Sequence, residues 1–365
     1  MTRESGMTVQ RPELALEAVP SEEALDRLVY LVGPTRSGTS VIYDCIGLHP
    51  RALGFPALTY FVNRVWRYRH RVDERTWREL LHQTSYFRPK EVIQGLDEQT
   101  GERLSRRYSA ALKRKDFAEL YRLYPLFYAL SAECDKDPAA IRCWTDKANN
   151  WRGLSAIRRA LPQARFVFVV RDPRSVVLSN MGRSLRRQQR EHDSAPDLGE
   201  VVEAGLYWRV MMLMLLRFAS RHPSSVAWVR YEDFVTDPAR ELNRLFTFMV
   251  GEGLAEDKLA ALLGTVGGGA TNRADETYSG ISDTPRERWR RELGAAELAV
   301  IGSIAGRTAR RFGYQLAPSP PSAALTAILA MPRPAKKLAA AAKLVAAALL
   351  DRLVADAFPL ADLRK

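Results

Sequence analysis

The chain has 365 residues, 46% of them hydrophobic, and its formal net charge of +13 favours anionic partners such as a nucleotide, an acidic glycan, a membrane surface or a nucleic acid. This length fits one large α/β domain or two smaller ones. The longest strongly apolar stretch, 210–216, is far shorter than the ~20 residues of a membrane span. The three cysteines show no metal-ligand spacing, so we expect reduced thiols in a cytoplasmic protein.

The chain begins with a predicted mobile arm, followed by a strand, a loop and a helix. Residues 1–24 lack the apolar segment of a signal peptide and are predicted to form the arm. The apolar run 28–32 predicts a strand, residues 33–40 (GPTRSGTS) a loop, and 41–48 a helix. This order is typical of a loop that binds phosphate.

The glycine spacing of this loop supports the same interpretation. Gly33 and Gly38 are separated by four residues, as in the P-loop, but Thr39 stands where the P-loop has lysine. The loop can still direct backbone N–H groups and a helix N-terminus at an anion. Arg36 supplies the positive charge that the missing lysine would carry. The pattern therefore indicates an anion other than a magnesium–triphosphate.

The rest of the chain alternates helices with apolar strands. Residues 57–130 are rich in arginine and aromatic residues and predict a helical insertion. A second strand is predicted at 141–145, a helix at 151–161, and further strands at 165–170 (RFVFVV) and 226–230. Such alternation predicts an α/β protein with a parallel sheet.

A second loop motif follows the RFVFVV strand. Residues 171–179 read RDPRSVVLS, and together with the loop at 33–40 they resemble the motifs of the PAPS-dependent sulfotransferases, where PAPS is 3′-phosphoadenosine 5′-phosphosulfate. The motifs are most similar to those of the tyrosylprotein and carbohydrate branch, and the resemblance covers about 28–314. It implies a P-loop NTPase-like, three-layer fold with a central parallel sheet and a helical insertion on the acceptor side. It also implies transfer of a sulfuryl group from PAPS to an acceptor hydroxyl, with release of adenosine 3′,5′-bisphosphate.

The resemblance assigns roles to both loops. The first would bind the 5′-phosphosulfate, and the second the 3′-phosphate through its first arginine and last serine. The residues so implied are Arg36, Ser37, Gly38, Thr39, Ser40, Arg171 and Ser179. Because sulfuryl transfer depends on positioning and positive charge, side chains can replace a metal, and we expect none.

Four further residues match positions of the family. Lys147, 24 residues before the 3′-phosphate arginine, resembles a lysine that stabilises the transition state, so Lys147 and Arg36 are the predicted catalytic residues. Tyr231 lies in an RYEDF segment and is expected near the nucleotide. Ser279 and Arg288 flank a segment that resembles the one closing over the cofactor.

The general base is not identified by the sequence. Many family members place a glutamate or histidine shortly after the first helix, but this chain has no Asp or Glu between Cys45 and Asp73. A base must reach the proton that it removes, and sequence does not show reach. The acceptor is left open among a sugar, a phenol, a lipid-linked glycan and a natural product.

Two other functions are compatible with parts of the sequence. A P-loop kinase or NTPase would use RFVFVVRD as a Walker-B strand ending in Asp172, although Thr39 in place of lysine argues against it. A non-enzymatic basic protein that binds nucleic acid or membranes would fit the charge, but no recognised nucleic-acid motif is present.

The expected domain boundaries follow from composition. The sulfotransferase domain is predicted at 25–316, followed at 317–365 by a proline-rich linker and an alanine-rich amphipathic helical tail. We expect the apolar stripe of this tail to cover its own domain or a second subunit of a homo-oligomer. Peripheral contact with a membrane through its lysines is the alternative.

Overall fold

The structure is a computed structural model and describes residues 20–54, 118–119, 121–122, 136–149, 151–188, 198–266, 281, 287–317, 320–330 and 339–343. Most of the predicted arm, nearly all of the predicted helical insertion, and Ser279 lie outside these residues.

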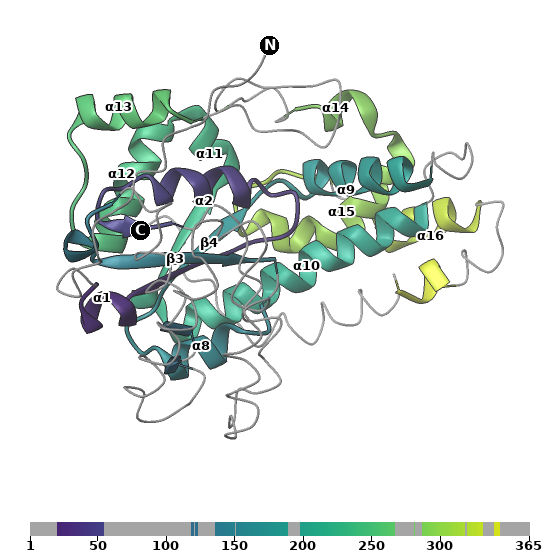
Figure 1. Cartoon of the computed structure of the whole chain (residues 1–365). Coiled ribbons are helices and arrows are strands. Elements are labelled where there is room, and N and C mark those ends of the chain that lie inside the picture. Colours follow the sequence, from purple (N-terminus) through teal and green to yellow (C-terminus); the bar gives the residue numbers. More distant parts are fainter. Residues whose placement is uncertain are drawn as a thin grey trace, which may run out of the picture. The chain divides into compact units, whose positions relative to one another are not determined.

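The described part of the chain contains a five-stranded sheet with the order β2-β3-β1-β4-β5 (Figure 1). The pairs β2–β3, β1–β4 and β4–β5 are parallel. The strands are β1 (Leu28–Val32), β2 (Ala52–Leu53), β3 (Cys143–Ala148), β4 (Arg165–Val170) and β5 (Val226–Arg230).

Continuous apolar sequence explains the two strands at the centre of this order. Every residue of β1 is buried, and so is every residue of β4 except Arg165. Leu31 pairs with Val167 and Val32 with Phe168, which fixes the register. Strands covered on both faces carry no polar alternation, and this is the pattern that predicted them.

The helices surround these strands in chain order. They are α1 (Glu22–Asp26), α2 (Thr39–Gly47), α8 (Leu154–Ala160), α9 (Pro173–Gln188), α10 (Leu198–Arg221), α11 (Tyr231–Thr236), α12 (Pro238–Val250), α13 (Glu256–Gly264), α14 (Trp289–Glu292), α15 (Ala295–Arg310) and α16 (Pro321–Leu329), with 3₁₀ turns at Pro138–Ala140 and Pro223–Ser225. None of the described helices combines the length and apolarity needed to cross a membrane.

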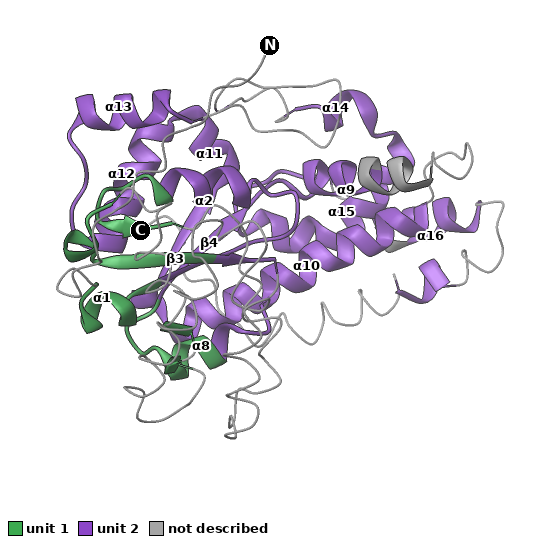
Figure 2. Ribbon diagram, viewed as in Figure 1, with its two compact units in different colours: residues 1–28, 47–146, 156–164 green, residues 29–46, 147–155, 165–365 purple. Residues whose placement is uncertain are grey.

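The chain divides into two compact units (Figure 2). Unit 1 comprises residues 1–28, 47–146 and 156–164, and unit 2 comprises 29–46, 147–155 and 165–365. In unit 1, the indole N–H of Trp144 donates to the carbonyl of Leu25 at 2.8 Å, which ties β3 to α1.

Unit 2 contains a group of long helices. Helix α10 packs against α9 and α15, and α15 packs against α16, so that these helices run side by side (Figure 1). The core face of α10 includes the buried side chains of Val202, Met211 and Leu215. Gly205 of α10 faces Ile304 of α15, where a Cβ would lie 3.5 Å from the isoleucine side chain. The small residue lets the two helices approach closely.

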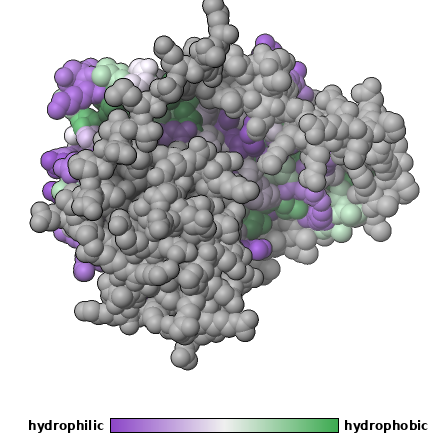
Figure 3. Space-filling view, viewed as in Figure 1, coloured by the Kyte–Doolittle hydropathy of each residue, from purple (hydrophilic) through white to green (hydrophobic). Residues whose placement is uncertain are grey.

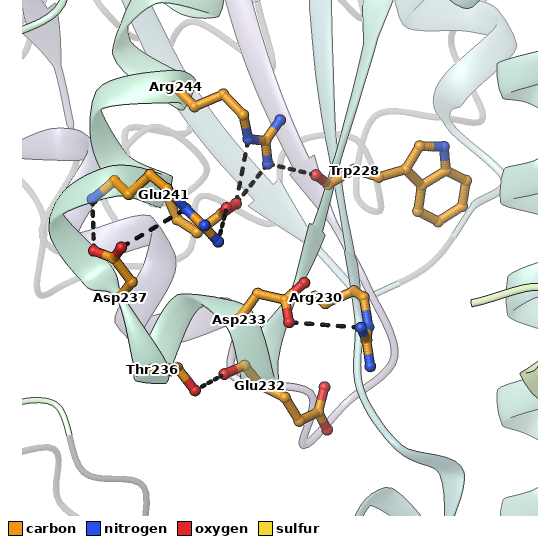
Figure 4. A network of polar contacts seen from close by, with 9 residues as sticks. Trp228, Arg230, Glu232, Asp233, Thr236, Asp237, Glu241 and Arg244 are labelled. Atoms are coloured by element: carbon orange, nitrogen blue, oxygen red, sulfur yellow. Dashed lines mark hydrogen bonds and ion pairs between the residues drawn. The ribbon is translucent and has the colours of Figure 1, made fainter. Parts of the chain in front are cut away.

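Strand β5 continues directly into a helical corner made by α11 and α12. Asp237 caps α12 by accepting from the N–H of Arg240 at 3.0 Å, and Gly251 ends that helix at a φ of 89°. Arg244 of α12 reaches back to the carbonyl of Trp228 at 2.7 Å and pairs with Glu241, as Figure 4 shows. These bonds fix the helix against the strand.

After this corner, α13 carries an exposed polar face. Glu256, Asp257 and Lys258 of its first turns are exposed, whereas Leu259 is buried. In the space-filling view, hydrophilic surface dominates this edge of the described residues (Figure 3).

The structure differs from the expected elements in four places. Helix α1 begins within the predicted arm, because Ser21 accepts from the N–H of Ala24 and caps it. The second predicted strand, 141–145, is instead Cys143–Ala148, so Lys147 lies on the strand and not after it. The short strand β2 was not predicted. Helix α16 starts at Pro321, inside the predicted linker.

Candidate active site

The phosphate-type loop of unit 2 connects β1 to α2 and is held in shape by Ser37. The Ser37 hydroxyl donates to the carbonyl of Pro34 at 2.5 Å, and its N–H donates to the same carbonyl at 3.1 Å. Arg36 adopts a φ of 71°, and it is the one non-glycine residue with positive φ in the described chain. A non-glycine residue in this region is strained, and such strain concentrates at functional sites.

Gly38 allows the loop to lie directly against an aromatic ring. Its φ is 84°, and a Cβ built on it would lie 2.2 Å from Cδ2 of Tyr231, so no other residue fits without a shift. The guanidinium of Arg171 stacks on the same ring, with its central carbon 4.2 Å from the ring centroid. Tyr231, at the start of α11, therefore contacts both loop motifs.

The two predicted anion-binding motifs meet in unit 2. Nε of Arg36 donates to the hydroxyl of Ser179 on α9 at 2.8 Å. Nη1 of Arg171, just after β4, donates to the carbonyl of Arg36 at 3.1 Å. The structure thus brings together Arg36, Arg171 and Ser179, which the sequence separates by more than 130 positions. Positive charge and a hydroxyl converge at the start of two helices, α2 and α9, as an anion site requires.

Lys147 lies on the far end of β3 beside helix α2. Its Nζ is 4.6 Å from the centroid of the Tyr43 ring. Asp44, the next residue of α2, interacts electrostatically with the same ammonium. Partial burial raises the pKa of the Asp44 carboxyl, and Lys147 acts in the opposite direction. Lys147 is therefore held by α2, the helix that follows the phosphate-type loop.

A carboxylate network supports the second motif from behind. The carboxylate of Asp172 accepts from Arg174, with Nη2 at 2.6 Å, and the Arg174 guanidinium lies 3.6 Å from the centroid of Trp289. The N–H of Asp172 donates to Glu232 at 3.0 Å, and the hydroxyl of Tyr314 donates to the other oxygen of Glu232 at 2.6 Å. Burial, reinforced by Glu232, raises the pKa of Tyr314, so this hydroxyl stays a donor.

The remaining predicted residues have different surroundings. Thr39 is buried as the first residue of α2, and the adjacent Ser40 is exposed. Arg288 pairs with Glu292, from its Nε at 2.7 Å. Ser279 lies outside the described residues, so the structure shows nothing of its position.

A comparison with models of protein families matches residues 29–252 to the sulfotransferase family. This chain belongs to the sulfotransferase family. The match spans both loop motifs, α10 and the corner after β5. A comparison with curated proteins returned no match.

Solved structures share the fold of this sulfotransferase. The sulfotransferase domain of the Synechococcus PCC 7002 olefin synthase is 17% identical, covers 84% of this chain and 99% of that domain, and aligns with a TM-score of 0.51. The sulfotransferase domain from the curacin biosynthetic pathway is 15% identical, covers 80% of this chain and 99% of that domain, with a TM-score of 0.50. The α/β fold expected from the motifs is confirmed.

Membership of the family makes the chain an enzyme that transfers sulfuryl groups. The kinase and the non-enzymatic interpretations are therefore not supported. Asp172, which a Walker-B interpretation would assign to magnesium, is instead paired with Arg174.

Sequence reasoning missed several residues of this sulfotransferase site. Arg174 and Glu232 lie inside motifs that were recognised, but the motif roles drew attention to their neighbours Arg171 and Tyr231. Asp44 escaped notice because the search for a carboxylate started after Cys45, although Asp44 is the group that interacts with Lys147.

Proposed function

We propose that this sulfotransferase uses PAPS as its donor and transfers the sulfuryl group to an acceptor hydroxyl, releasing adenosine 3′,5′-bisphosphate. The observation that carries the proposal is the junction of the two loops, in which Arg36 contacts Ser179 and Arg171 contacts the carbonyl of Arg36. A donor with a 5′-phosphosulfate and a 3′-phosphate needs two anion sites within one nucleotide length. The junction offers two such sites side by side.

The roles of the charged residues follow from the reaction. The bond between sulfur and the bridging phosphate oxygen breaks, a bond between sulfur and the acceptor oxygen forms, and the acceptor hydroxyl loses its proton. Negative charge develops on the leaving phosphate, and preorganised cations lower the energy of that state most effectively. Arg36 would meet the phosphosulfate from the loop, and Lys147 would meet the transferring group from the end of β3. We propose no metal, because these cations supply the charge.

The second motif would hold the 3′-phosphate. Arginine is suited to this because its planar fork binds a phosphate through two parallel bonds. The stacking of Arg171 on Tyr231 supports this assignment, because it fixes the plane of the fork. Ser179 and the exposed Ser40 would add hydroxyl donors, and the backbone of Ser37, Gly38 and Thr39 would line the phosphosulfate site. Ser279 and Arg288 stay predicted cofactor contacts.

The acceptor side and the location are proposed more broadly. The acceptor is a hydroxyl of a sugar, a phenol, a lipid-linked glycan or a natural product. Cys45 and Cys143 are buried free thiols, which fits the reducing cytoplasm that we propose.

Calorimetry with adenosine 3′,5′-bisphosphate tests the donor directly. We expect it to bind more tightly than ADP or ATP, and equally well with and without EDTA. Arg171→Ala should abolish this preference, because ADP lacks the 3′-phosphate. Arg217→Ala, on the far part of α10, is the matched arginine control and should bind like the wild type. A strict magnesium requirement or a preference for ATP would show that the donor is not PAPS.

A further inference from the structure

Two adjacent residues of α10 contact all three loops that carry the proposed site. The Tyr207 hydroxyl accepts from the N–H of Thr35 at 3.2 Å and donates to the carbonyl of Asn149 at 2.9 Å. The indole N–H of Trp208 donates to the carbonyl of Arg171 at 3.0 Å. Thr35 precedes Arg36, and Asn149 lies two residues after Lys147. One turn of α10 is therefore bonded next to each proposed cationic residue.

These loops follow three different strands of the sheet. Thr35 follows β1, Asn149 follows β3 and Arg171 follows β4. Loops at the carboxyl ends of parallel strands form the ligand site in open α/β sheets, but nothing in a strand fixes the spacing between one loop and the next. A group bonded to several of these loops sets that spacing.

The chemistry of the two side chains suits this task. A tyrosine hydroxyl has one proton and can accept another bond, so Tyr207 uses both capacities to join two loops. An indole N–H only donates, and Trp208 uses it on a backbone carbonyl. Trp208 is fully buried and packs edge-to-face on Phe312, with ring centroids 6.5 Å apart. The helix beneath them is anchored in the core by several apolar side chains.

We infer that Tyr207 and Trp208 are positioning residues, which set the distances between Arg36, Lys147 and Arg171. The inference rests on the proposed roles of these three cations. Tyr207 acts on the two residues assigned to the transferring group, so its loss should slow the reaction. Trp208 acts on the residue assigned to the 3′-phosphate, so its loss should weaken binding of the nucleotide.

Conservative variants separate these effects. In Tyr207→Phe, the single-turnover rate of PAPS conversion to adenosine 3′,5′-bisphosphate should fall about 10- to 100-fold, because displacement of reacting groups by an ångström costs about that much. The Kd of the bisphosphate should stay within about two-fold. In Trp208→Phe, that Kd should rise about ten-fold, while the rate at saturating PAPS changes less than in Tyr207→Phe.

Two controls distinguish positioning from general loss of stability. Trp228→Phe removes an indole that packs on the same Phe312, with ring centroids 5.0 Å apart, and should lower the melting temperature without either kinetic effect. The double variant Tyr207→Phe with Lys147→Ala should be little slower than Lys147→Ala alone, because Tyr207 acts partly through Lys147. Amide hydrogen exchange at Thr35 should speed up in Tyr207→Phe but not in Trp208→Phe.

The outcomes are decisive in either direction. If both variants match Trp228→Phe in rate, affinity and exchange, the inference is wrong. If wild-type protein fails to bind adenosine 3′,5′-bisphosphate, the proposed donor is wrong, and exchange at Thr35 still decides whether Tyr207 holds the loop.

Discussion

Arg36 and Ser179 are 143 positions apart in sequence, yet Nε of the arginine lies 2.8 Å from the hydroxyl of the serine. The arginine comes from the loop assigned to the phosphosulfate, and the serine from the motif assigned to the 3′-phosphate. Their contact means that the two proposed anion sites share a border. Binding at one site should therefore change the surroundings of the other.

The first prediction separates chemistry from binding. Arg36→Ala and Lys147→Ala should lower turnover by about 10²–10³-fold and weaken binding of adenosine 3′,5′-bisphosphate much less, because that product lacks the transferring group. Arg171→Ala should chiefly weaken binding. Rapid-quench kinetics and calorimetry on the three variants would measure this. The same kinetic signature for Arg36→Ala and Arg171→Ala would contradict the division of roles.

The second prediction concerns the close approach of Gly38 to Tyr231. Gly38→Ala and Gly251→Ala should share a backbone penalty of about 1–2 kcal/mol, because both glycines have φ near +85° to +90°. Only Gly38→Ala also drives a methyl group into the tyrosine ring, since Gly251 has nothing within 4 Å. Gly38→Ala should therefore unfold at a lower denaturant concentration and lose nucleotide binding. Adding Tyr231→Ala should recover part of the lost stability; if it recovers none, the contact is not the cause.

The third prediction tests the support behind the second motif. Arg174→Ala breaks the ion pair with Asp172 and the stacking on Trp289, and should lower the free energy of unfolding by about 1.5–3 kcal/mol, as expected for hydrogen bonds to charged groups. Arg290 also stacks on Trp289 but is largely exposed, so Arg290→Ala is the matched control and should change stability little. Equal losses in the two variants, measured by urea denaturation, would argue against a special role for Arg174.

The fourth prediction concerns alkaline pH. Burial, with a smaller contribution from Asp44, raises the pKa of the Cys45 thiol from 9.0 to about 12. Between these values the unfolded chain loses the proton that the folded chain keeps, so this thiol makes stability fall with rising pH, by at most about 1.4 kcal/mol per unit. Urea denaturation from pH 8 to pH 11 should show a steeper fall for wild type than for Cys45→Ala. Parallel curves would contradict it.

The fifth prediction compares two truncations of the tail. Helix α16 packs on α15 through Ala324 and Ile328, both fully buried, and Ser303 donates to the carbonyl of Pro320 at 3.2 Å. Removing residues 321–365 should therefore lower the melting temperature more than removing 331–365, while both proteins still bind adenosine 3′,5′-bisphosphate.

Liposome co-sedimentation tests the membrane alternative for the same tail. Lys343 pairs with Glu203 of α10, so at least this lysine is engaged by the protein's own unit. We expect weak binding to anionic vesicles at low salt and none at high salt, in full-length and truncated protein alike. Salt-resistant binding that disappears on truncation would overturn the packed-tail interpretation.

The sequence predicted the central strands well, for a physical reason. The predicted bounds 28–32, 165–170 and 226–230 agree with β1, β4 and β5, because continuous apolar runs between polar loops leave little ambiguity. The bounds of β3 were wrong, since Asp146 and Lys147 are polar and continue the strand. A two-residue strand such as β2 carries no periodic signal at all.

The site was predictable only where the chain carries a motif. Loop sequences with special backbone geometry revealed Arg36, Gly38 and Arg171, because few residue patterns allow that geometry. Tyr207 and Trp208 lie in an amphipathic helix, where aromatic residues usually pack in the core, so sequence alone gives no reason to select them. Their importance depends on which loops happen to fold above α10.

The φ of 71° at Arg36 gives this loop an unusual balance between comfort and charge. A glycine would relax the backbone there, but it would remove the guanidinium that reaches Ser179. An alanine would remove the guanidinium and keep the strain. The loop is thus less stable than its sequence neighbourhood would permit, and it tolerates this because the side chain is required at that point. Selection for stability alone would replace Arg36 with glycine, and selection for sulfuryl transfer would restore it.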